Sequence, residues 1–469
     1  MKEQMSRAET FTAVTVLSIL SASGCTVGPD YKRPVVTPPE AFRSQAKEDA
    51  ARPTFGDTQW ASVFQDEALQ RLIRAGLASN YDLQIAAARI LQAEAQLGIN
   101  RADQFPTING QASGQKTHGP TSNGETRTVG VAQVGGTLSW ELDFWGKYRR
   151  ATEAARAQLL ASDWGRRAVV TSLISQLANG YFVLRALDAQ LDISQRTLKS
   201  REESRHLTQI RADGGAASLV DVRQAEQLVF TARGQIVDLK RRVEQQENAL
   251  SYLIGRGPGP IERGQLLTDQ AHAPEVPEGL PSTLLERRPD IQQAEQLLVA
   301  ANAQIGVAKA SYFPQINLTG AGGVASSALS SLFKTGAWAF GATVVQPIFN
   351  AGRNRSRVQL ADARHQEAEL VYQQKIQQSF REASDAIVGY RSQREFRESQ
   401  EGLFVAAQDG RRLADVRYRG GVTSYLEVLD SDTRLFTAEL GLAQARLAEL
   451  TGFVELYRSL GGGWQSAEK

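Results

Sequence analysis

The sequence contains two copies of one long pattern, and this duplication constrains the fold more than any other feature. Residues Asp82–Pro106 align without gaps on Asp290–Pro314, with ten of 25 positions identical and a shift of 208 residues. Residues between Arg211 and Val222 recur between Arg417 and Val428 at a shift of 206. The two shifts differ by two residues, which implies a short insertion or deletion in a loop between the two matching blocks. Two repeats of this length predict one architecture with two equivalent halves, rather than a solenoid of short units.

Each half shows the same order of secondary-structure signals. An Ala- and Gln-rich helix of about 24 residues ends at Phe-Pro, and two segments of alternating polarity follow it. A very long helical stretch, a Gly-Gly pair and a second long helix complete the half. We therefore place the first repeat at residues 81–260, a linker or equatorial segment at 261–286 and the second repeat at 287–463, ahead of a C-terminal tail at 464–469.

The alternating segments carry polar residues on one face and apolar residues on the other. Every odd-numbered residue of 107–115 is polar, and the even-numbered residues from Val134 to Phe144 are apolar or Gly. The same alternation recurs in 315–319 and 338–344. Strands of about ten residues with aromatics near the ends of the apolar face are typical of a transmembrane β-barrel. A soluble sandwich is the alternative, but the remaining sequence is helical and supplies no second sheet.

Four strands are too few to close a barrel. An open sheet edge in hydrocarbon leaves backbone groups unsatisfied, at several kcal/mol each. Several chains must therefore pool their strands if the sheet lies in a membrane. Two chains give eight strands, a barrel filled by its own side chains, whereas three give twelve and leave room for a pore. The pattern predicts an obligate oligomer and favours a trimer for a conduit.

The helical stretches are long and end at glycine pairs. Lys147–Arg211 contains no Pro over roughly 65 residues, which predicts a helix of about 100 Å if it is continuous. The helix after the first pair has an apolar heptad that includes Val222, Val229 and Leu250, typical of a coiled coil. Gly tolerates the positive φ that a helix reversal needs. The predicted hairpin tips therefore contain Gly214, Gly215 and Ser218 in the first half, and Gly420, Gly421 and Ser424 in the second.

The composition argues against metal, redox and nucleic-acid chemistry. Cys25 is the single cysteine, and the four histidines are far apart in the sequence, so no cysteine zinc site, Fe–S cluster or disulfide is expected. A net charge of +2 gives no excess of cations for nucleic acid. The phosphate-loop, H-E-x-x-H and G-x-S-x-G motifs do not occur in the sequence. We expect neither an enzyme nor a bound cofactor.

The N-terminus has the pattern of an exported lipoprotein. Residues 11–20 form an apolar run of ten residues, the length of a signal-peptide core and too short to span a bilayer as a helix. Small residues then precede Cys25, which resembles a bacterial lipobox. We therefore predict a signal peptide at 1–24, acylation of Cys25 with chains such as palmitate, and a lipidated arm and equatorial segment at 25–80. An ordinary signal peptide with an incidental cysteine is the alternative. Thr26, in place of Asp after the cysteine, implies the outer membrane by this resemblance.

These features together resemble one known family. The lipobox, the arm CTVGPDYKRP, the duplicated strand and hairpin units and the GG-x-x-S-x-x-[ED]-V tips are similar to the TolC-like outer-membrane efflux proteins, in their lipoprotein (OprM/CusC/NodT-like) branch. The resemblance covers essentially the whole mature chain. Recurrent segments of that branch are matched by WELDFWGK at Trp140–Lys147, ERRPDI at Glu286–Ile291 and QPIFNAGR at Gln346–Arg353.

The resemblance implies a mainly α fold with a transmembrane β part. In that fold a homotrimer forms a 12-stranded β-barrel and a periplasmic α-helical tunnel, lipid-anchored in the outer membrane of a Gram-negative cell. It also implies a passive efflux duct for drugs or other toxic solutes. A periplasmic adaptor (membrane fusion) protein and an inner-membrane pump of the RND type are its expected partners, with the adaptor docking at the hairpin tips.

The resemblance also implies a gate at the second hairpin tip. Its acidic positions match Glu427 and Asp430, and Tyr418 matches a residue that ties the closed aperture. Three copies of each acid around a threefold axis would favour cations. The corresponding residues of the first repeat are Asp221 and Gln224, so one acid recurs. The alternative is a solvated helix face, because the two acids are three residues apart.

A trimeric coiled-coil surface protein with a structural or adhesive role is the competing functional hypothesis. It accounts for the heptads and for oligomerisation. It does not account for a duplication that includes amphipathic strand pairs, or for the two Gly-Gly tips.

Overall fold

The structure is a computed structural model of the chain. The predicted signal peptide at 1–24 and the lipidation residue Cys25 lie outside the described residues, as do 271–280 of the linker and 465–469 of the tail. The described residues are 26–39, 55–120, 122–270, 281–327, 332–334 and 336–464.

The two halves of the sequence fold into the same series of elements. Each of the three main helices of the first half has a counterpart of equal length in the second half. The first helices have 22 residues each, the long helices 67 each and the last helices 35 each. The bounds shift by 208 residues for the first helices (289 − 81) and by 206 for the others (353 − 147). The helices are α4 (Tyr81–Ala102), α5 (Lys147–Asp213) and α6 (Leu219–Leu253), then α8 (Pro289–Ala310), α9 (Arg353–Arg419) and α10 (Tyr425–Ser459).

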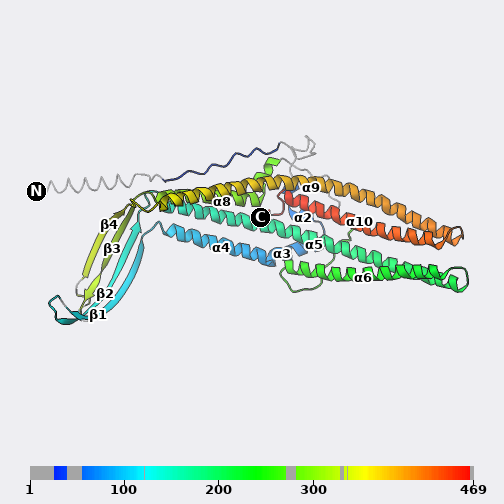
Figure 1. Cartoon of the computed structure of the whole chain (residues 1–469), viewed down its shortest axis with the longest axis horizontal. Coiled ribbons are helices and arrows are strands. Elements are labelled where there is room, and N and C mark those ends of the chain that lie inside the picture. Colours follow the sequence, from blue (N-terminus) through cyan, green and yellow to red (C-terminus); the bar gives the residue numbers. More distant parts are fainter. Residues whose placement is uncertain are drawn as a thin grey trace. The chain divides into compact units, whose positions relative to one another are not determined.

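Four strands form one antiparallel sheet in the order β1-β2-β3-β4, so that each strand pairs with its neighbour in the sequence. Figure 1 shows this meander. The register keeps one set of alternate residues together: Ile108 lies opposite Leu138, and Leu138 lies opposite Gly320, which lies opposite Phe340. The strands are β1 (Thr107–Pro120), β2 (Thr126–Glu141), β3 (Gln315–Ser326) and β4 (Gly336–Val345).

The apolar face of the sheet is uncovered within the described chain. Trp338, Phe340 and Ile108 are 85%, 75% and 74% exposed. Within the described sheet β1 pairs only with β2, and β4 pairs only with β3, so each end of the sheet presents an unpaired edge. An exposed apolar face and two open edges are the features that a soluble sheet ordinarily avoids.

Strand lengths differ from the sequence-based expectation of about ten residues. β1 and β2 have 14 and 16 residues, because cross-strand pairing continues until Pro120 and the turn at Gly124, whose φ is +80°. β2 also ends at Glu141, although the alternation predicted a strand to Phe144. There the chain turns into α5, where the Asp143 carboxylate accepts the Arg149 backbone N–H at 2.9 Å.

The chain divides into two compact units, each of which draws on both repeats. One contains the sheet, with the described residues up to Val35, Arg89–Asp163 and Gln293–Gln373. The other contains Trp164–Gln292 and Gln374–Lys469 together with the segment that ends at Ala88, as far as these are described. The residue boundaries predicted for the repeats describe sequence duplication and stay a prediction. The second unit also holds the short elements η2 (Phe55–Asp57), α2 (Trp60–Val63), α3 (Glu67–Ser79), η3 (Pro281–Thr283) and α7 (Leu284–Arg287).

The second unit contains most of two antiparallel helical hairpins, α5–α6 and α9–α10, with α5 from Trp164 and α9 from Gln374 onward (Figure 1). Val222, Val229 and Leu250 of the predicted heptad are buried in α6. The corresponding line in α10 includes Val428, Leu442 and Leu456, and a companion line in α10 holds the small residues Ala438 and Ala445; all five are buried. Small residues at these positions let helices approach closely. No helix among the described residues is long and apolar enough to cross a membrane.

Candidate functional site

Glycine in the left-handed region closes each hairpin tip. Gly215 has φ +73° and Gly421 has φ +72°, values that side-chain-bearing residues rarely adopt. In the first tip, Ser218 caps α6: its hydroxyl accepts the Val220 N–H at 3.1 Å, and the Asp221 carboxylate accepts the Ser218 N–H at 3.0 Å. This reciprocal capping box satisfies two amide donors that the helix start leaves free.

The second tip is built differently. Ser424 precedes α10 without a side-chain capping bond, and the Thr423 hydroxyl donates instead to the Glu427 carboxylate. Gly420 lies before Gly421, and its N–H donates to the Val416 carbonyl at 3.0 Å. The two tips therefore share a backbone turn but differ in the polar groups around it.

The two acids of the predicted gate lie on the first turns of α10. Glu427 is half-buried, and its carboxylate lies 3.6 Å from Arg417 Nε. Asp430 is exposed and lies 2.8 Å from Arg434 Nε. Each acid thus has a cationic neighbour within its own hairpin. Both carboxylates remain accessible to solvent, so another charged group can approach each of these ion pairs.

Tyr418 joins the two hairpins. Its ring centroid lies 5.3 Å from that of Tyr425 on α10, and the Arg211 guanidinium of α5 lies 4.7 Å from the Tyr418 ring. Tyr418 also packs on a small buried cluster that includes Ala225 of α6 and Val428 of α10. The structure places this residue against both hairpins, whereas Glu427 and Asp430 are paired within the second.

A buried ion pair between the hairpins was missed by the sequence reasoning. Arg201 of α5 and Asp432 of α10 are both buried, and Arg201 Nε donates to Asp432 Oδ2 at 2.9 Å. Arg411 of α9 lies 3.6 Å from the other carboxylate oxygen. Ser204 lies about one helical turn from Arg201 toward the hairpin tip, and its hydroxyl is 2.7 Å from the Tyr425 hydroxyl. These five residues, which we call the hairpin lock, connect α5 to α9 and α10.

The surroundings of Arg201 are well matched to its charge. Its Nη1 donates to the Leu228 carbonyl at 3.1 Å, and its guanidinium lies 4.8 Å from the Phe436 ring centroid. Removing one partner of a buried ion pair leaves the other charge uncompensated, at about 3–5 kcal/mol. The lock therefore resists separation of the hairpins. The available sequence signal was an Arg and an Asp at buried positions of two helices. Because the two residues are 231 positions apart, the sequence alone did not indicate that they form a pair.

Among the residues that the structure describes, no cluster of three or more His, Cys, Asp or Glu could hold a metal ion. The polar groups at the tips are ion pairs, caps and hydroxyl contacts. Their chemistry is that of holding helices together or releasing them.

Comparison with known proteins gives matches along nearly the whole chain. The family described as "Outer membrane efflux protein" matches residues 72–256 and again 280–462. The cation efflux system protein CusC of Escherichia coli O6:H1 is 35% identical over 450 residues, covering 95% of this chain and 97% of CusC. The probable efflux pump outer membrane protein TtgC of Pseudomonas putida is 38% identical over 455 residues, covering 94% of this chain and 93% of TtgC. The open-state structure of the Neisseria gonorrhoeae MtrE outer membrane channel superposes with a TM-score of 0.87 at 32% identity, covering 94% of this chain and 99% of MtrE.

Proposed function

The chain belongs to the outer membrane efflux protein family, and from this premise we propose how its own residues build and gate the duct. It is an outer-membrane channel of a tripartite efflux system, extends into the periplasm and is not an enzyme. The observation that carries this function in the structure is the four-stranded sheet, which has an exposed apolar face and two unpaired edges. The competing hypothesis of an adhesive coiled coil gives such a sheet no role.

We propose that three chains pool their sheets, β1 of one chain pairing with β4 of the next. The resulting twelve strands satisfy both edges of every sheet, which hydrocarbon requires. The apolar residues that include Ile108, Trp338 and Phe340 then face lipid, and the polar face lines the lumen. Twelve strands leave an interior wide enough for solutes, whereas eight are filled by side chains.

The gate is proposed at the tip of the second hairpin. Three copies of Glu427 and Asp430 around the threefold axis narrow the periplasmic entrance and favour cations. The solvent-accessible carboxylates support this role. Tyr418 and the hairpin lock hold α9 and α10 against α5, so opening requires these contacts to separate.

The partners expected at the tips are a periplasmic adaptor protein and, through it, an inner-membrane pump of the RND type. The exposed turns of the two hairpins are the proposed docking surface for the adaptor. This surface consists of Gly214, Gly215 and Ser218 in the first hairpin and Gly420, Gly421 and Ser424 in the second.

The arm that follows Cys25 supports the proposed lipid anchor. The Val27 N–H donates to the Trp145 carbonyl at 3.1 Å, just beyond the end of β2. Further along, Arg33 Nη2 lies 2.6 Å from a Glu295 carboxylate oxygen. An arm held in this way fixes the described residues that follow the predicted acylation position at the end of the sheet, where the membrane boundary is expected.

The cargo is proposed to be chosen mainly by the pump. Relatives include a cation efflux system protein and a toluene efflux pump outer membrane protein, so related ducts are named for different solutes. The sequence after Cys25 contains no Met or Cys and therefore offers no thioether or thiolate path for Cu(I). Drugs or other toxic solutes are the expected cargo class.

Conductance in planar bilayers tests the duct. We expect purified trimers to conduct weakly, and Glu427→Gln/Asp430→Asn to conduct more and to lose cation preference. Asp409→Asn on α9 is the matched control, because Asp409 is an exposed acid paired with Arg412 and away from the gate turns. Trimers that form no channel, even with both gate acids neutralised, would contradict the proposed function.

A further inference from the structure

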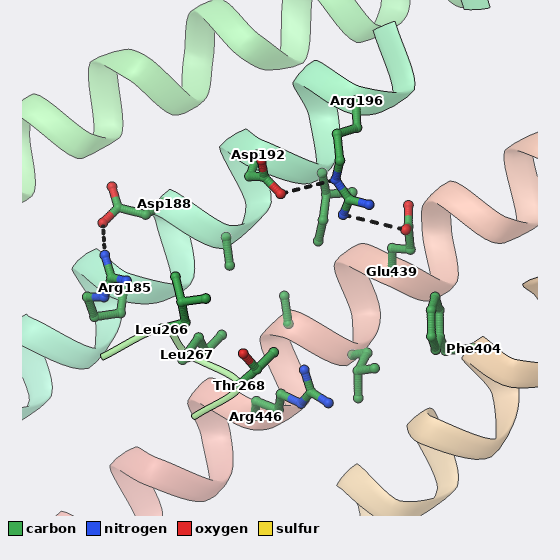
Figure 2. Close-up of a pocket in the computed structure, with 14 residues that line it drawn as sticks. Arg185, Asp188, Asp192, Arg196, Leu266, Leu267, Thr268, Phe404, Glu439 and Arg446 are labelled. Atoms are coloured by element: carbon green, nitrogen blue, oxygen red, sulfur yellow. Dashed lines mark hydrogen bonds and ion pairs between the residues drawn. The ribbon is translucent and has the colours of Figure 1, made fainter. Parts of the chain in front are cut away.

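A cavity of about 440 Å³ lies between α5, α9, α10 and residues 266–268 (Figure 2). This volume is within the range of small-molecule binding sites. Apolar side chains form much of its wall, among them Ile193 of α5, Leu267, Phe404 of α9 and Leu442 of α10. The cavity is separate from the tip residues of the proposed gate.

The arginines that line this cavity each have a close carboxylate partner. Asp188 lies 2.7 Å from Arg185, Asp192 lies 3.1 Å from Arg196, and Glu401 lies 3.3 Å from Arg446. These cations are therefore already neutralised by the chain. An anion that entered the cavity would have to displace one of these carboxylates.

Glu439 is the carboxylate of the cavity with the weakest pairing. Among the described residues it pairs with Arg196, whose Nη2 lies 3.8 Å away and which also pairs with Asp192. Figure 2 shows Arg196 between the two acids. Glu439 is half-buried, and this burial raises the pKa of its carboxyl. Asp432 and Asp192 raise the pKa further, while Arg196 lowers it.

We propose that this cavity binds a hydrophobic monovalent cation. The cationic centre of the ligand pairs with the Glu439 carboxylate, and its apolar body packs against Ile193, Leu267 and Leu442. Phe404 adds an aromatic face that attracts a cation. A neutral ligand would leave the half-buried carboxylate with its long pairing to Arg196, which Asp192 shares, and such weak compensation is unfavourable in apolar surroundings.

This binding site goes beyond the proposed function. A ligand held here contacts α5 and α10 together, seven residues along α10 from Asp432 of the hairpin lock (439 − 432). Seven residues are about two helical turns. The bound cation therefore stabilises the association of the two hairpins. Binding is measured on purified trimers without a membrane, so its outcome is independent of channel conductance.

Equilibrium dialysis of tetraphenylphosphonium against purified trimers in non-ionic detergent tests the site. Protein-free micelles give the baseline, and tetraphenylborate is the control of similar shape and opposite charge. We expect one saturable site per chain for the cation, and binding about tenfold weaker or less in Glu439→Gln, as loss of a charged contact implies. Glu244→Gln, at an exposed acid on α6 outside the cavity, controls for the change in net charge.

A second variant distinguishes the cavity from the charge. Ala189→Phe places a larger side chain at the half-buried wall of the cavity and is expected to weaken cation binding while Glu439 is intact. Size-exclusion chromatography checks that each variant remains trimeric. Equal cation binding by wild type, Glu439→Gln and Ala189→Phe would overturn the proposal. Equal saturable binding of tetraphenylborate would do the same.

Discussion

Removing the carboxylate of Asp432 should make the channel open more often. Asp432→Asn keeps the side-chain shape but leaves Arg201, which is 3% exposed, without its partner at 2.9 Å. A buried charge that loses its partner destabilises the joined arrangement by about 3–5 kcal/mol. If separated hairpins let Arg201 reach water, the ratio of closed to open channels falls roughly a hundredfold or more.

Single-channel recordings in planar bilayers measure this ratio as the open probability. Glu202→Gln is a closely matched control, because Glu202 follows Arg201 in α5 but pairs with Arg233 of α6 within the same hairpin. That exposed pair is worth at most about 1 kcal/mol and does not join the hairpins. We therefore expect the control to behave like the wild type.

A double variant separates release of the lock from general damage to the fold. Arg201→Met/Asp432→Leu removes both charges, and replacing a buried ion pair by apolar residues is often neutral for stability. We expect its open probability to return toward the wild-type value. An unchanged open probability in Asp432→Asn would refute the reasoning, and so would a double variant that opens as often as the single one.

Three further predictions follow from other parts of the structure. Gly421→Ala should lower the free energy of unfolding by about 1–2 kcal/mol, because the φ of Gly421 is +72°. Gly420 lies outside the left-handed region, so Gly420→Ala should not have this effect, and thermal unfolding of the two variants compares them. Burial raises the pKa of Asp66, but hydrogen bonds from Gln270, Tyr181 and two backbone amides outweigh it and hold the pKa below the usual value of an aspartate. This stabilisation is present above about pH 4 and is lost as the pH falls through the folded-state pKa, so Asp66→Asn should flatten the acid side of the Tm profile. Cys25→Ser should abolish acyl labelling, while the variant protein should still insert into the outer membrane. Unchanged labelling of the variant would contradict the assignment of a lipobox.

The repeated elements could be predicted from the sequence because local signals specify them. Phe-Pro ends the first helix of each half, alternation marks the strands, and Gly-Gly interrupts helices that contain no Pro over long stretches. The apolar face of the sheet, which we propose meets lipid, follows from the same alternation, since Ile108 and Phe340 share a face in the observed register. These are short-range patterns, and the duplication provides each of them twice.

The contacts between hairpins could not be predicted in this way. Arg201 and Asp432 belong to different repeats, and Glu439 approaches Arg196 only once α5 and α10 lie side by side. Helical periodicity shows which face of a helix is buried but not which residue of another helix meets it. The end of β2 at Glu141 was missed for a similar reason, since it depends on a turn into α5 that interrupts an otherwise apolar alternation.

Cross-linking of β1 to β4 between chains is the most direct test of a conduit built from pooled strands. In a Cys25→Ser background, Ser113→Cys is combined in turn with cysteine at Ala337, Ala339 or Gly341, because a disulfide forms only between closely approaching backbones. We predict that at least one pair gives a covalent ladder that ends at three chains. A ladder that ends at two chains, one that continues beyond three, or no cross-link with any pair would contradict the account.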